Sequence, residues 1–323
     1  MQATRRELLI LAQRMRAGVT NVRRKSSFLR PSQAIYNLII KPLEEELEAQ
    51  QITNIGFLMD RGLRGIPIAA LHDGEDFIIA NYSVGLMPSL SMSELDYVDL
   101  KNDSVLAMGA DTFVDQFPLP AVPIEVETIS NKIWQGTSFL NEAFTIENLT
   151  SSRANATYGI LHLATHAEFN PGTPADSYIQ LGNQKLSLDE LNELGLNDPP
   201  MELIVLSACR TALGNDDAEM GFAGLALMAG VKSALGSLWN VSDEGTLSLM
   251  TNFYHDLRFA PTKTEALRRA QLSMLNGEVY ITNGQLITPD GPLSLPPELS
   301  ILDDRNFSHP YYWSGFTMIG SPW

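Results

Sequence analysis

Residues 203–209 read LIVLSAC, and residues 160–166 read ILHLATH. Continuous apolar runs of this length are typical of parallel strands that are buried on both faces of a sheet. Each run ends in a chemically reactive side chain, His166 in one and Cys209 in the other. Because functional groups collect at the carboxyl ends of strands in open α/β sheets, we expect the imidazole and the thiol to meet at one edge of the sheet.

Taken singly, each of these two residues has a simpler explanation. A lone cysteine after a core strand is most often a small buried apolar residue, and a lone histidine is most often structural. Here the two occur together, and His166 precedes Cys209 by 43 residues. That spacing is close to the roughly 50 residues of the caspase arrangement, in which the cysteine follows the histidine. The pair therefore favours a thiol protease.

Length and composition indicate a globular protein with more than one average core. The chain has 323 residues, of which 44% are hydrophobic and 19% are charged, so we expect two α/β lobes or one lobe with a large extension. Its apolar stretches fall short of the roughly 18 residues of a membrane span, and its start lacks a signal-peptide core. One cysteine cannot form an internal disulfide, which favours a reducing compartment and predicts a cytoplasmic protein.

The charge balance excludes one class of partner. The formal net charge is -16, which repels nucleic acid and favours basic partners, so we expect a protein substrate and neither nucleic acid nor membrane. The first 30 residues differ, because Glu7 is their only acidic residue. Their basic residues are Arg5, Arg6, Arg14, Arg16, Arg23, Arg24, Lys25 and Arg30. This segment is either a linker or docking face, or a solvated basic helix packed on an acidic body.

Helical and strand-like segments alternate along most of the chain, which is typical of an α/β fold with a parallel sheet. Helices are expected at 7–18, 33–50 with a break at Pro42, 124–134, after the Ser187–Glu190 capping box, and at 221–230, 243–257 and 266–275. Strands are expected at 55–59, 76–84, 105–109, 160–166, 203–209, 233–239 and 313–319, with a loop at 276–309. We divide the chain into a basic extension (1–32), a first lobe (33–103) and a second lobe (104–323).

The paired residues supply the chemistry of a thiol protease. The attacking species is the thiolate, and an unperturbed cysteine pKa near 8.5 leaves only a small fraction ionised at neutral pH. His166 would accept the Cys209 proton or stabilise the thiolate, and would then protonate the leaving amine. The tetrahedral intermediate also needs N–H donors. The candidates are the amides of Cys209 and of Ala167, which follows the histidine.

Neither a metal nor a cofactor is expected. The remaining histidines, His72, His162, His255 and His309, are scattered and lack the spacing of metal ligands. A phosphate-binding glycine loop is also missing, because Gly221 and Gly224 fall within an expected packing helix.

Four blocks of the sequence resemble the CHAT domain, a family of caspase- and separase-like cysteine peptidases. They are LATHA at 163–167, VLSACRTALG at 205–214, GFAGLA at 221–226 and SLWNVSD at 237–243. The segments PIAALHDG at 67–74 and HPYYWSGF at 309–316 also look like this family. The resemblance runs from about residue 33 to the end. It implies a caspase-like three-layer α/β fold with a mostly parallel sheet, a pseudo-protease lobe followed by an active protease lobe, and His166 and Cys209 as the dyad.

The sequence departs from the family pattern at two points. Caspase-like enzymes usually carry glycine after the histidine, whereas this chain has Ala167, whose amide can still donate if its φ angle allows. CHAT domains commonly follow tetratricopeptide repeats that bind a regulator, and this chain lacks them. The basic start resembles the junction to such repeats, so a repeat domain or regulatory protein is a candidate partner.

The resemblance to separase also suggests a residue for substrate recognition. It makes Asp243 the candidate for binding an arginine or lysine before the scissile bond (P1) through a charge-assisted hydrogen bond. Alternatively, Asp243 only complements the dipole at the start of the next helix. Three acidic residues beyond Cys209 would shape the cleft or form a solvated loop, namely Asp216, Asp217 and Glu219. Asp176 is a weaker candidate.

These observations favour a cytosolic cysteine endopeptidase that cleaves a protein partner. Two alternatives stay open. One is a catalytically idle caspase-like scaffold that acts by binding proteins, and the other is a thiol hydrolase of small molecules such as an amidase.

Overall fold

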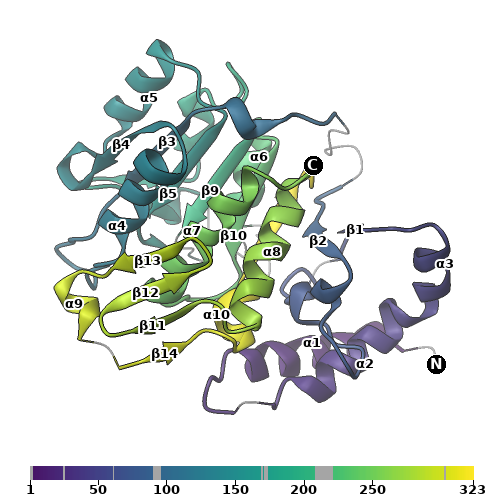
Figure 1. Ribbon diagram of the computed structural model, residues 1–323. Coiled ribbons are helices and arrows are strands. Elements are labelled where there is room, and N and C mark those ends of the chain that lie inside the picture. The colour runs from purple at the N-terminus through teal and green to yellow at the C-terminus, as the bar shows by residue number, and fades with distance from the viewer. Residues whose placement is uncertain are drawn as a thin grey trace.

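The computed structural model describes residues 3–24, 26–60, 62–89, 96–168, 170, 174–207, 221–301 and 303–323. Its centre is an eight-stranded sheet with helices packed against it, in the order β1-β2-β15-β10-β9-β5-β3-β4 (Figure 1). The strands are β1 (Asn54–Phe57), β2 (Ser83–Leu86), β3 (Val105–Gly109), β4 (Gly136–Leu140), β5 (Ile160–Ala164), β9 (Leu203–Ser207), β10 (Ser233–Ser237) and β15 (Phe316–Gly320). All neighbouring pairs are parallel except β10 and β15. The expected mostly parallel α/β sheet is thus confirmed.

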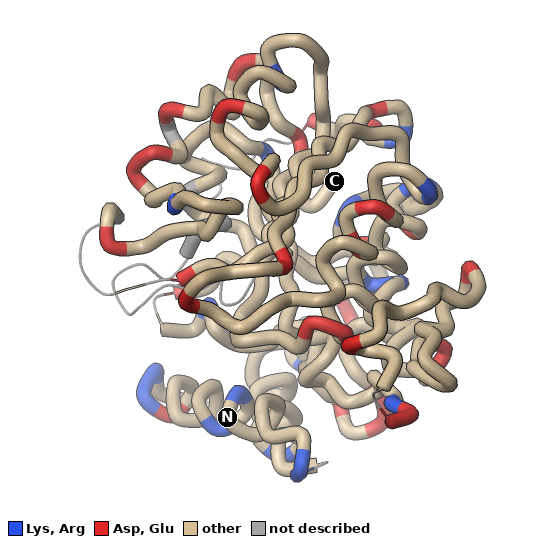
Figure 2. The backbone as a smooth tube through the Cα atoms, turned by 90° about the vertical axis from the view of Figure 1, so that its left-hand side faces the viewer, with Lys and Arg blue, Asp and Glu red and all other residues tan. Residues whose placement is uncertain are grey.

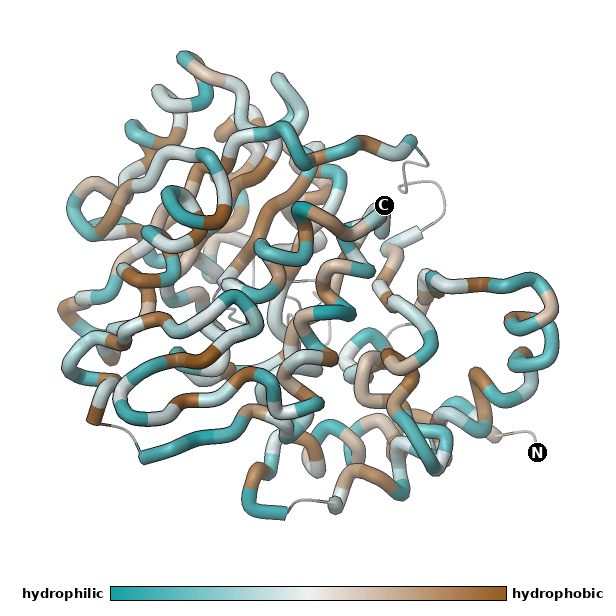
Figure 3. Tube along the Cα trace, viewed as in Figure 1, coloured by the Kyte–Doolittle hydropathy of each residue, from teal (hydrophilic) through white to brown (hydrophobic). Residues whose placement is uncertain are grey.

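The central strands are buried on both faces. Every residue of β3, β5, β9 and β10 is buried, and the brown segments in the middle of Figure 3 show how hydrophobic the centre of the sheet is. The helices are α1 (Arg5–Val19), α2 (Leu29–Ile39), α3 (Glu44–Ala49), α4 (Val122–Glu127), α5 (Ile146–Asn155), α6 (Gly221–Met228), α7 (Asp243–Leu257), α8 (Lys263–Leu275), α9 (Pro297–Ser300) and α10 (Pro310–Trp313). Two of them begin at the caps expected from the sequence: Ser242 accepts the Gly245 amide, and Thr262 accepts the Glu265 amide.

The basic start of the chain forms a helical hairpin that packs on the body. Helix α1 begins at a capping box between Thr4 and Glu7, and Arg16 on the same helix donates to the Leu238 carbonyl oxygen at 2.7 Å. Phe28, at the start of α2, contacts the ring of His309 edge to face. Figure 2 shows Lys and Arg along these helices and acidic residues over much of the rest of the chain. A basic helix packed on an acidic body therefore describes the arrangement.

The segment expected to form a first lobe joins the same sheet. Its strands β1 and β2 lie at one edge, where Leu86 of β2 pairs with Ile319 of β15. The Asn54 amide, at the start of β1, donates to the hydroxyls of Ser83 and Thr264. The proposed lobe boundaries at residues 33 and 104 stay a prediction.

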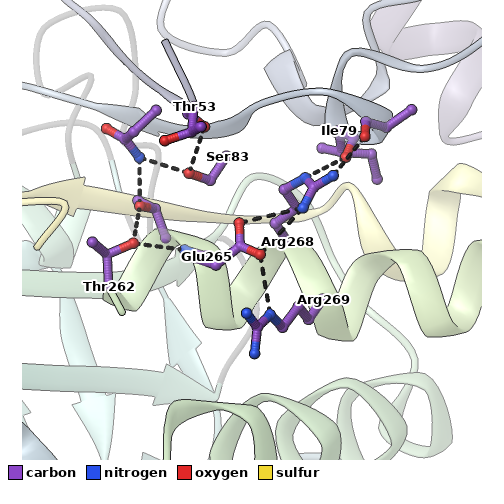
Figure 4. A network of polar contacts seen from close by, with 10 residues as sticks. Thr53, Ile79, Ser83, Thr262, Glu265, Arg268 and Arg269 are labelled. Carbon is purple, nitrogen blue, oxygen red and sulfur yellow. Dashed lines mark hydrogen bonds and ion pairs between the residues drawn. The ribbon is translucent and has the colours of Figure 1, made fainter. Parts of the chain in front are cut away.

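Helix α8 anchors this edge through a polar network (Figure 4). Arg268 donates from Nε to the Ile79 carbonyl oxygen at 2.6 Å and from Nη2 to the Ala80 carbonyl oxygen at 2.5 Å. Glu265 pairs with both Arg268 and Arg269. Arg268 thus satisfies two backbone acceptors that lie nearly 190 residues earlier in the chain.

Arg268→Ala is expected to lower the free energy of unfolding by about 2 to 4 kcal/mol, because it leaves two partly buried carbonyls without this donor. Arg269→Ala is the matched control, since Arg269 is 40% exposed and pairs with Glu265 one turn earlier on the same helix. We expect that control to lose about 0.5 kcal/mol or less. Urea unfolding measures both values. Equal losses in the two variants would contradict the anchoring role of Arg268.

Two segments differ from expectation. The strand expected at 76–84 is a 3-10 turn at Ile78–Ala80 followed by β2. The Ala80 amide bonds to the Phe77 carbonyl and the Asn81 amide to the Ile78 carbonyl, which closes the 3-10 turn. Arg268 donates to the carbonyls of Ile79 and Ala80, which a strand would have used for pairing.

The prediction of a loop at 276–309 is also wrong. It contains α9 and a four-stranded sheet in the order β13-β12-β11-β14. The strands are β11 (Tyr280–Thr282), β12 (Gln285–Thr288), β13 (Gly291–Ser294) and β14 (Arg305–Asn306). Asn283 and Gly284 turn between β11 and β12 with φ angles of 50° and 71°, the conformation that makes Asn-Gly a strong hairpin signal.

Candidate active site

Strands β5 and β9 bring the two reactive segments to the same edge of the sheet. They pair in parallel with Ala164 opposite Ser207, and the Thr165 amide donates to the Ser207 carbonyl oxygen at 3.3 Å. His166 comes two residues after Ala164, as Cys209 comes two residues after Ser207. Cys209 lies outside the described residues, as do the acidic candidates Asp216, Asp217 and Glu219.

The imidazole of His166 is held in a defined orientation. Its Nε2 lies 2.7 Å from the Phe117 carbonyl oxygen. A carbonyl oxygen can only accept, so Nε2 carries the hydrogen and Nδ1 is the acceptor of the neutral ring. The ring of Phe113 lies 4.6 Å from the imidazole, centroid to centroid, and the Gln180 amide donates to the His166 carbonyl oxygen. The histidine is therefore fixed through both its backbone and its ring.

A small cavity lies beside this histidine. Its volume is about 30 Å³, enough for one or two water molecules. The polar residues that line it come from four segments: Glu125 of α4, Thr165 and His166 after β5, Ser207 of β9, and Asp243 and Thr246 of α7. The structure thus brings together the predicted residues His166 and Asp243.

Asp243 is the first residue of α7, and its carboxylate is partly buried. Oδ2 accepts the Ala121 amide at 2.8 Å. The pKa of Asp243 is raised to about 7, mainly by burial; the hydrogen bond from Ala121 opposes this shift, and the negative charges of Glu125, Glu244 and Asp111 add to it. A positively charged group that entered the cavity would favour the ionised carboxylate.

A buried polar cluster that the sequence analysis missed forms one wall of the cavity. Glu125 is 1% exposed, and its Oε1 accepts a hydrogen bond from the Ser207 hydroxyl at 2.5 Å. The same oxygen lies 3.0 Å from Nε2 of His162, whose Nδ1 lies 3.2 Å from the Tyr254 hydroxyl. The sequence held one signal for this cluster. Glu125 falls at helical spacing between Val122 and Ile129, and so lies on the apolar face of the helix expected at 124–134.

Ala167 lies in β6 (Ala167–Glu168), the edge of a small sheet with β7 (Tyr178–Gln180) and β8 (Lys185–Ser187). The Gln180 amide donates to the His166 carbonyl, so His166 and Gln180 form a hydrogen-bonded pair across the two strands. Bonded and non-bonded pairs alternate along antiparallel strands, so the next amide, that of Ala167, is expected to point away from β7.

The other candidates make local contacts and do not line this cavity. His72 accepts the Gly74 amide in a turn, His255 pairs with Asp290 at 2.9 Å, and His309 accepts the Tyr311 amide at the start of α10. Asp176 is exposed in a 3-10 turn. Over the described ranges, no three acidic, histidine or cysteine side chains gather as a metal site would require. No helix in those ranges is long and apolar enough to span a bilayer.

Comparison with known proteins agrees with this architecture. The family model of the CHAT domain matches residues 29–321. A chain of the separase–securin complex from Saccharomyces cerevisiae is 13% identical with a TM-score of 0.52, over 89% of this chain and 17% of that chain. Gingipain R, described as an Arg-specific cysteine proteinase, is 10% identical with a TM-score of 0.52, over 97% of this chain and 74% of that chain.

A complex of the pro- and mature domains of RgpB from Porphyromonas gingivalis is 11% identical with a TM-score of 0.54, over 99% of this chain and 77% of that chain. At these identities the likeness shows a shared caspase-like fold alone. The chain spans only 17% of the separase–securin chain that it matches. No curated protein sequence matches this chain.

Proposed function

Because the chain belongs to the CHAT domain family, we propose that it is a cysteine endopeptidase that cleaves a protein partner, with His166 and Cys209 as its dyad. The observation that carries this proposal is the parallel register of β5 and β9, which end side by side at Ala164 and Ser207. Each reactive residue follows its strand by two positions. Continued in the same direction, the two segments would deliver the thiol beside the imidazole.

The orientation of His166 supports its role as base and acid. Nδ1, the acceptor of the neutral ring, would take the proton of Cys209, and the thiolate would attack the peptide carbonyl carbon to form a tetrahedral intermediate. The resulting imidazolium keeps its Nε2–H bond to the Phe117 carbonyl, and this bond strengthens when the ring is charged. His166 would then protonate the leaving amine, and water would hydrolyse the thioester.

The backbone amides of Cys209 and Ala167 are proposed as the oxyanion donors. Two preorganised N–H groups stabilise the negative charge that develops on the carbonyl oxygen during attack. The expected direction of the Ala167 amide, away from β7, supports this assignment.

Asp243 is proposed to select a basic residue at P1. Its carboxylate lines the same cavity as His166, and a guanidinium or ammonium group would form a charge-assisted hydrogen bond with it. Gingipain R, whose fold this chain shares, is described as Arg-specific, which agrees with the proposal.

A protein partner beyond the substrate is also proposed. Among the similar structures is a separase–securin complex. The basic hairpin α1–α2 packs on an acidic body, in a chain whose net charge is -16, and we propose its outer face as the side on which a repeat domain or regulatory protein docks. The expectation of a cytoplasmic protein that binds neither nucleic acid nor membrane stays part of this proposal.

Peptide cleavage and covalent labelling together test the function. Fluorogenic peptides that differ only at P1 (Arg, Lys, Leu or Asp) are offered to the protein, alongside free amides. A peptidyl acyloxymethyl ketone with P1 arginine provides the label. We expect turnover of the Arg and Lys peptides and one label on Cys209, the only cysteine. Binding of peptides without turnover or labelling would favour the idle scaffold, and turnover of free amides alone would favour the amidase.

A further inference from the structure

We infer that Glu125 is a positioning residue, whose buried carboxylate holds the carboxyl ends of β5 and β9 in the arrangement that the reaction needs. This inference rests on the proposed function, because it concerns the same site. Glu125 acts through Ser207 and His162, which lie on the two strands that lead to the dyad.

A single carboxylate oxygen joins the two strands. Oε1 of Glu125 accepts from the hydroxyl of Ser207, the last residue of β9, and contacts Nε2 of His162, in the middle of β5. His162 is 0% exposed and Ser207 is 5% exposed. Strands that are already paired by backbone bonds are thus also tied together by a side chain from the helix above them.

Both ring nitrogens of His162 have partners in the cluster. Nδ1 lies 3.2 Å from the Tyr254 hydroxyl, and Nε2 lies 3.0 Å from Oε1 of Glu125. Burial raises the pKa of the Tyr254 hydroxyl well above 10, so this hydroxyl carries a proton that it can donate. In the tautomer with the hydrogen on Nε2, Tyr254 donates to Nδ1 and Nε2 donates to Glu125, whose Oε1 also accepts from Ser207.

Helix α4, which carries Glu125, is itself fixed. A Cβ added at Gly109 of β3 would lie 2.6 Å from Val122 Cγ1 and 3.0 Å from Val126 Cγ2, so glycine is needed for this close approach. At the start of the helix, the Ala121 amide is bonded to Asp243 of α7. The carboxylate of Glu125 is therefore held in place against the middle of β5 and the end of β9.

Fold stability alone does not explain a carboxylate at this position. Replacing a buried polar cluster by well-packed apolar residues is often neutral or stabilising. Glu125 instead lines the cavity that also holds His166 and Asp243. A small displacement of reacting groups costs up to about 10²-fold in rate. By holding β5 and β9 together, the Glu125 carboxylate would prevent such a displacement of the residues that follow the two strands.

The test uses Glu125→Gln, which keeps the shape and removes the charge, and the pair Ser207→Ala and Ser207→Thr, which removes or keeps the hydroxyl. Glu127→Gln, an exposed position on the same helix, is the matched control. For each protein we measure kcat and KM on the Arg peptide, the melting temperature, and the rate at which iodoacetamide alkylates Cys209, the only cysteine.

We expect Glu125→Gln and Ser207→Ala to lower kcat by about 10- to 100-fold with KM within about threefold. Alkylation at pH 7 is expected to slow by about fivefold, because a displaced His166 would favour the thiolate less. Ser207→Thr should restore most of the loss, and Glu127→Gln should match the parent. If Glu125→Gln does not fold, the two Ser207 variants carry the comparison.

Variants whose kcat and alkylation rate stay within twofold of the parent, while only their melting temperature falls, would overturn the inference. So would an equal loss in Glu127→Gln. If the parent cleaves no peptide, the proposed function fails, but alkylation still decides: slower alkylation in Glu125→Gln and Ser207→Ala supports the positioning role, and equal rates in all proteins overturn it.

Discussion

Cys209→Ala is expected to reduce kcat/KM for a peptide with P1 arginine by at least about 10⁴-fold, and His166→Ala by a similar factor. Alanine at 209 removes the nucleophile. Alanine at 166 removes both the base that would ionise the thiol and the acid that would protonate the leaving amine. Because the two groups act as a unit, the double variant should be no slower than either single variant. Initial rates with a fluorogenic Arg peptide measure all three.

The matched control for this pair is His255→Ala. His255 is also partly exposed and also hydrogen-bonded, with Nε2 at 2.9 Å from Asp290, but it lies near the end of α7 and does not line the cavity beside His166. Its removal should leave kcat/KM within about twofold. Parental activity in Cys209→Ala would show that the thiol takes no part in the reaction. If the losses of the two single variants add in the double variant, Cys209 and His166 act independently and not as a dyad.

The buried strands could be predicted because their pattern is strong. The runs at 105–109, 160–166, 203–209 and 233–239 all contain a strand of the central sheet. Two of these predictions extend two residues too far, since β5 ends at Ala164 and β10 at Ser237. Beyond β10, Leu238 and Trp239 stay buried through packing outside the sheet, so apolar character continues after the strand has ended.

The small sheet at 280–306 could not be predicted from hydrophobic runs. Its strands are two to four residues long; β11 and β12 place only one or two residues in the core, and β13 and β14 place none there. The Asn283–Gly284 turn was the one strong local signal, and two-residue turns of this kind specify a hairpin through positive φ angles and not through apolar content.

The candidate site was predictable only where residues follow strands. His166 and Asp243 each come after a strand whose position the apolar runs predict, and they line one cavity. Glu125 lies on a helix, and its partners His162 and Ser207 are 37 and 82 residues away in the chain. No local pattern links them, so the cluster becomes visible only in three dimensions.

The second large effect is a pH-dependent preference for arginine that depends on Asp243. We compare kcat/KM for an Arg peptide with that for a peptide carrying citrulline, an uncharged isostere, at P1. Both substrates use the same dyad, so its titration cancels in the ratio. Because the pKa of Asp243 is about 7, the Arg/citrulline ratio should rise by up to about tenfold per pH unit below pH 7 and level off above it.

Asp243→Asn should lower kcat/KM for the Arg peptide at pH 8 by about 10²- to 10³-fold, as expected when one partner of a partly buried charge pair is removed. The citrulline peptide should stay within about threefold of the parent, and the pH dependence of the ratio should disappear. Asp256→Asn is the matched control, because Asp256 is on the same helix and burial raises its pKa to about 6. Asp256 does not line the cavity beside His166, so the Arg/citrulline ratio of Asp256→Asn should equal that of the parent at each pH.

Thermal stability separates this role from the simpler one, in which Asp243 only complements the dipole of α7. The pKa of Asp243 in the folded protein lies above its ordinary value of 3.8, so ionisation opposes folding. The parent should lose stability relative to Asp243→Asn as pH rises from about 4 to 7, by about 2 kcal/mol after screening in the open cavity. A dipole role predicts the reverse, an asparagine variant less stable by up to about 1 kcal/mol at pH 8 with unchanged preference for arginine.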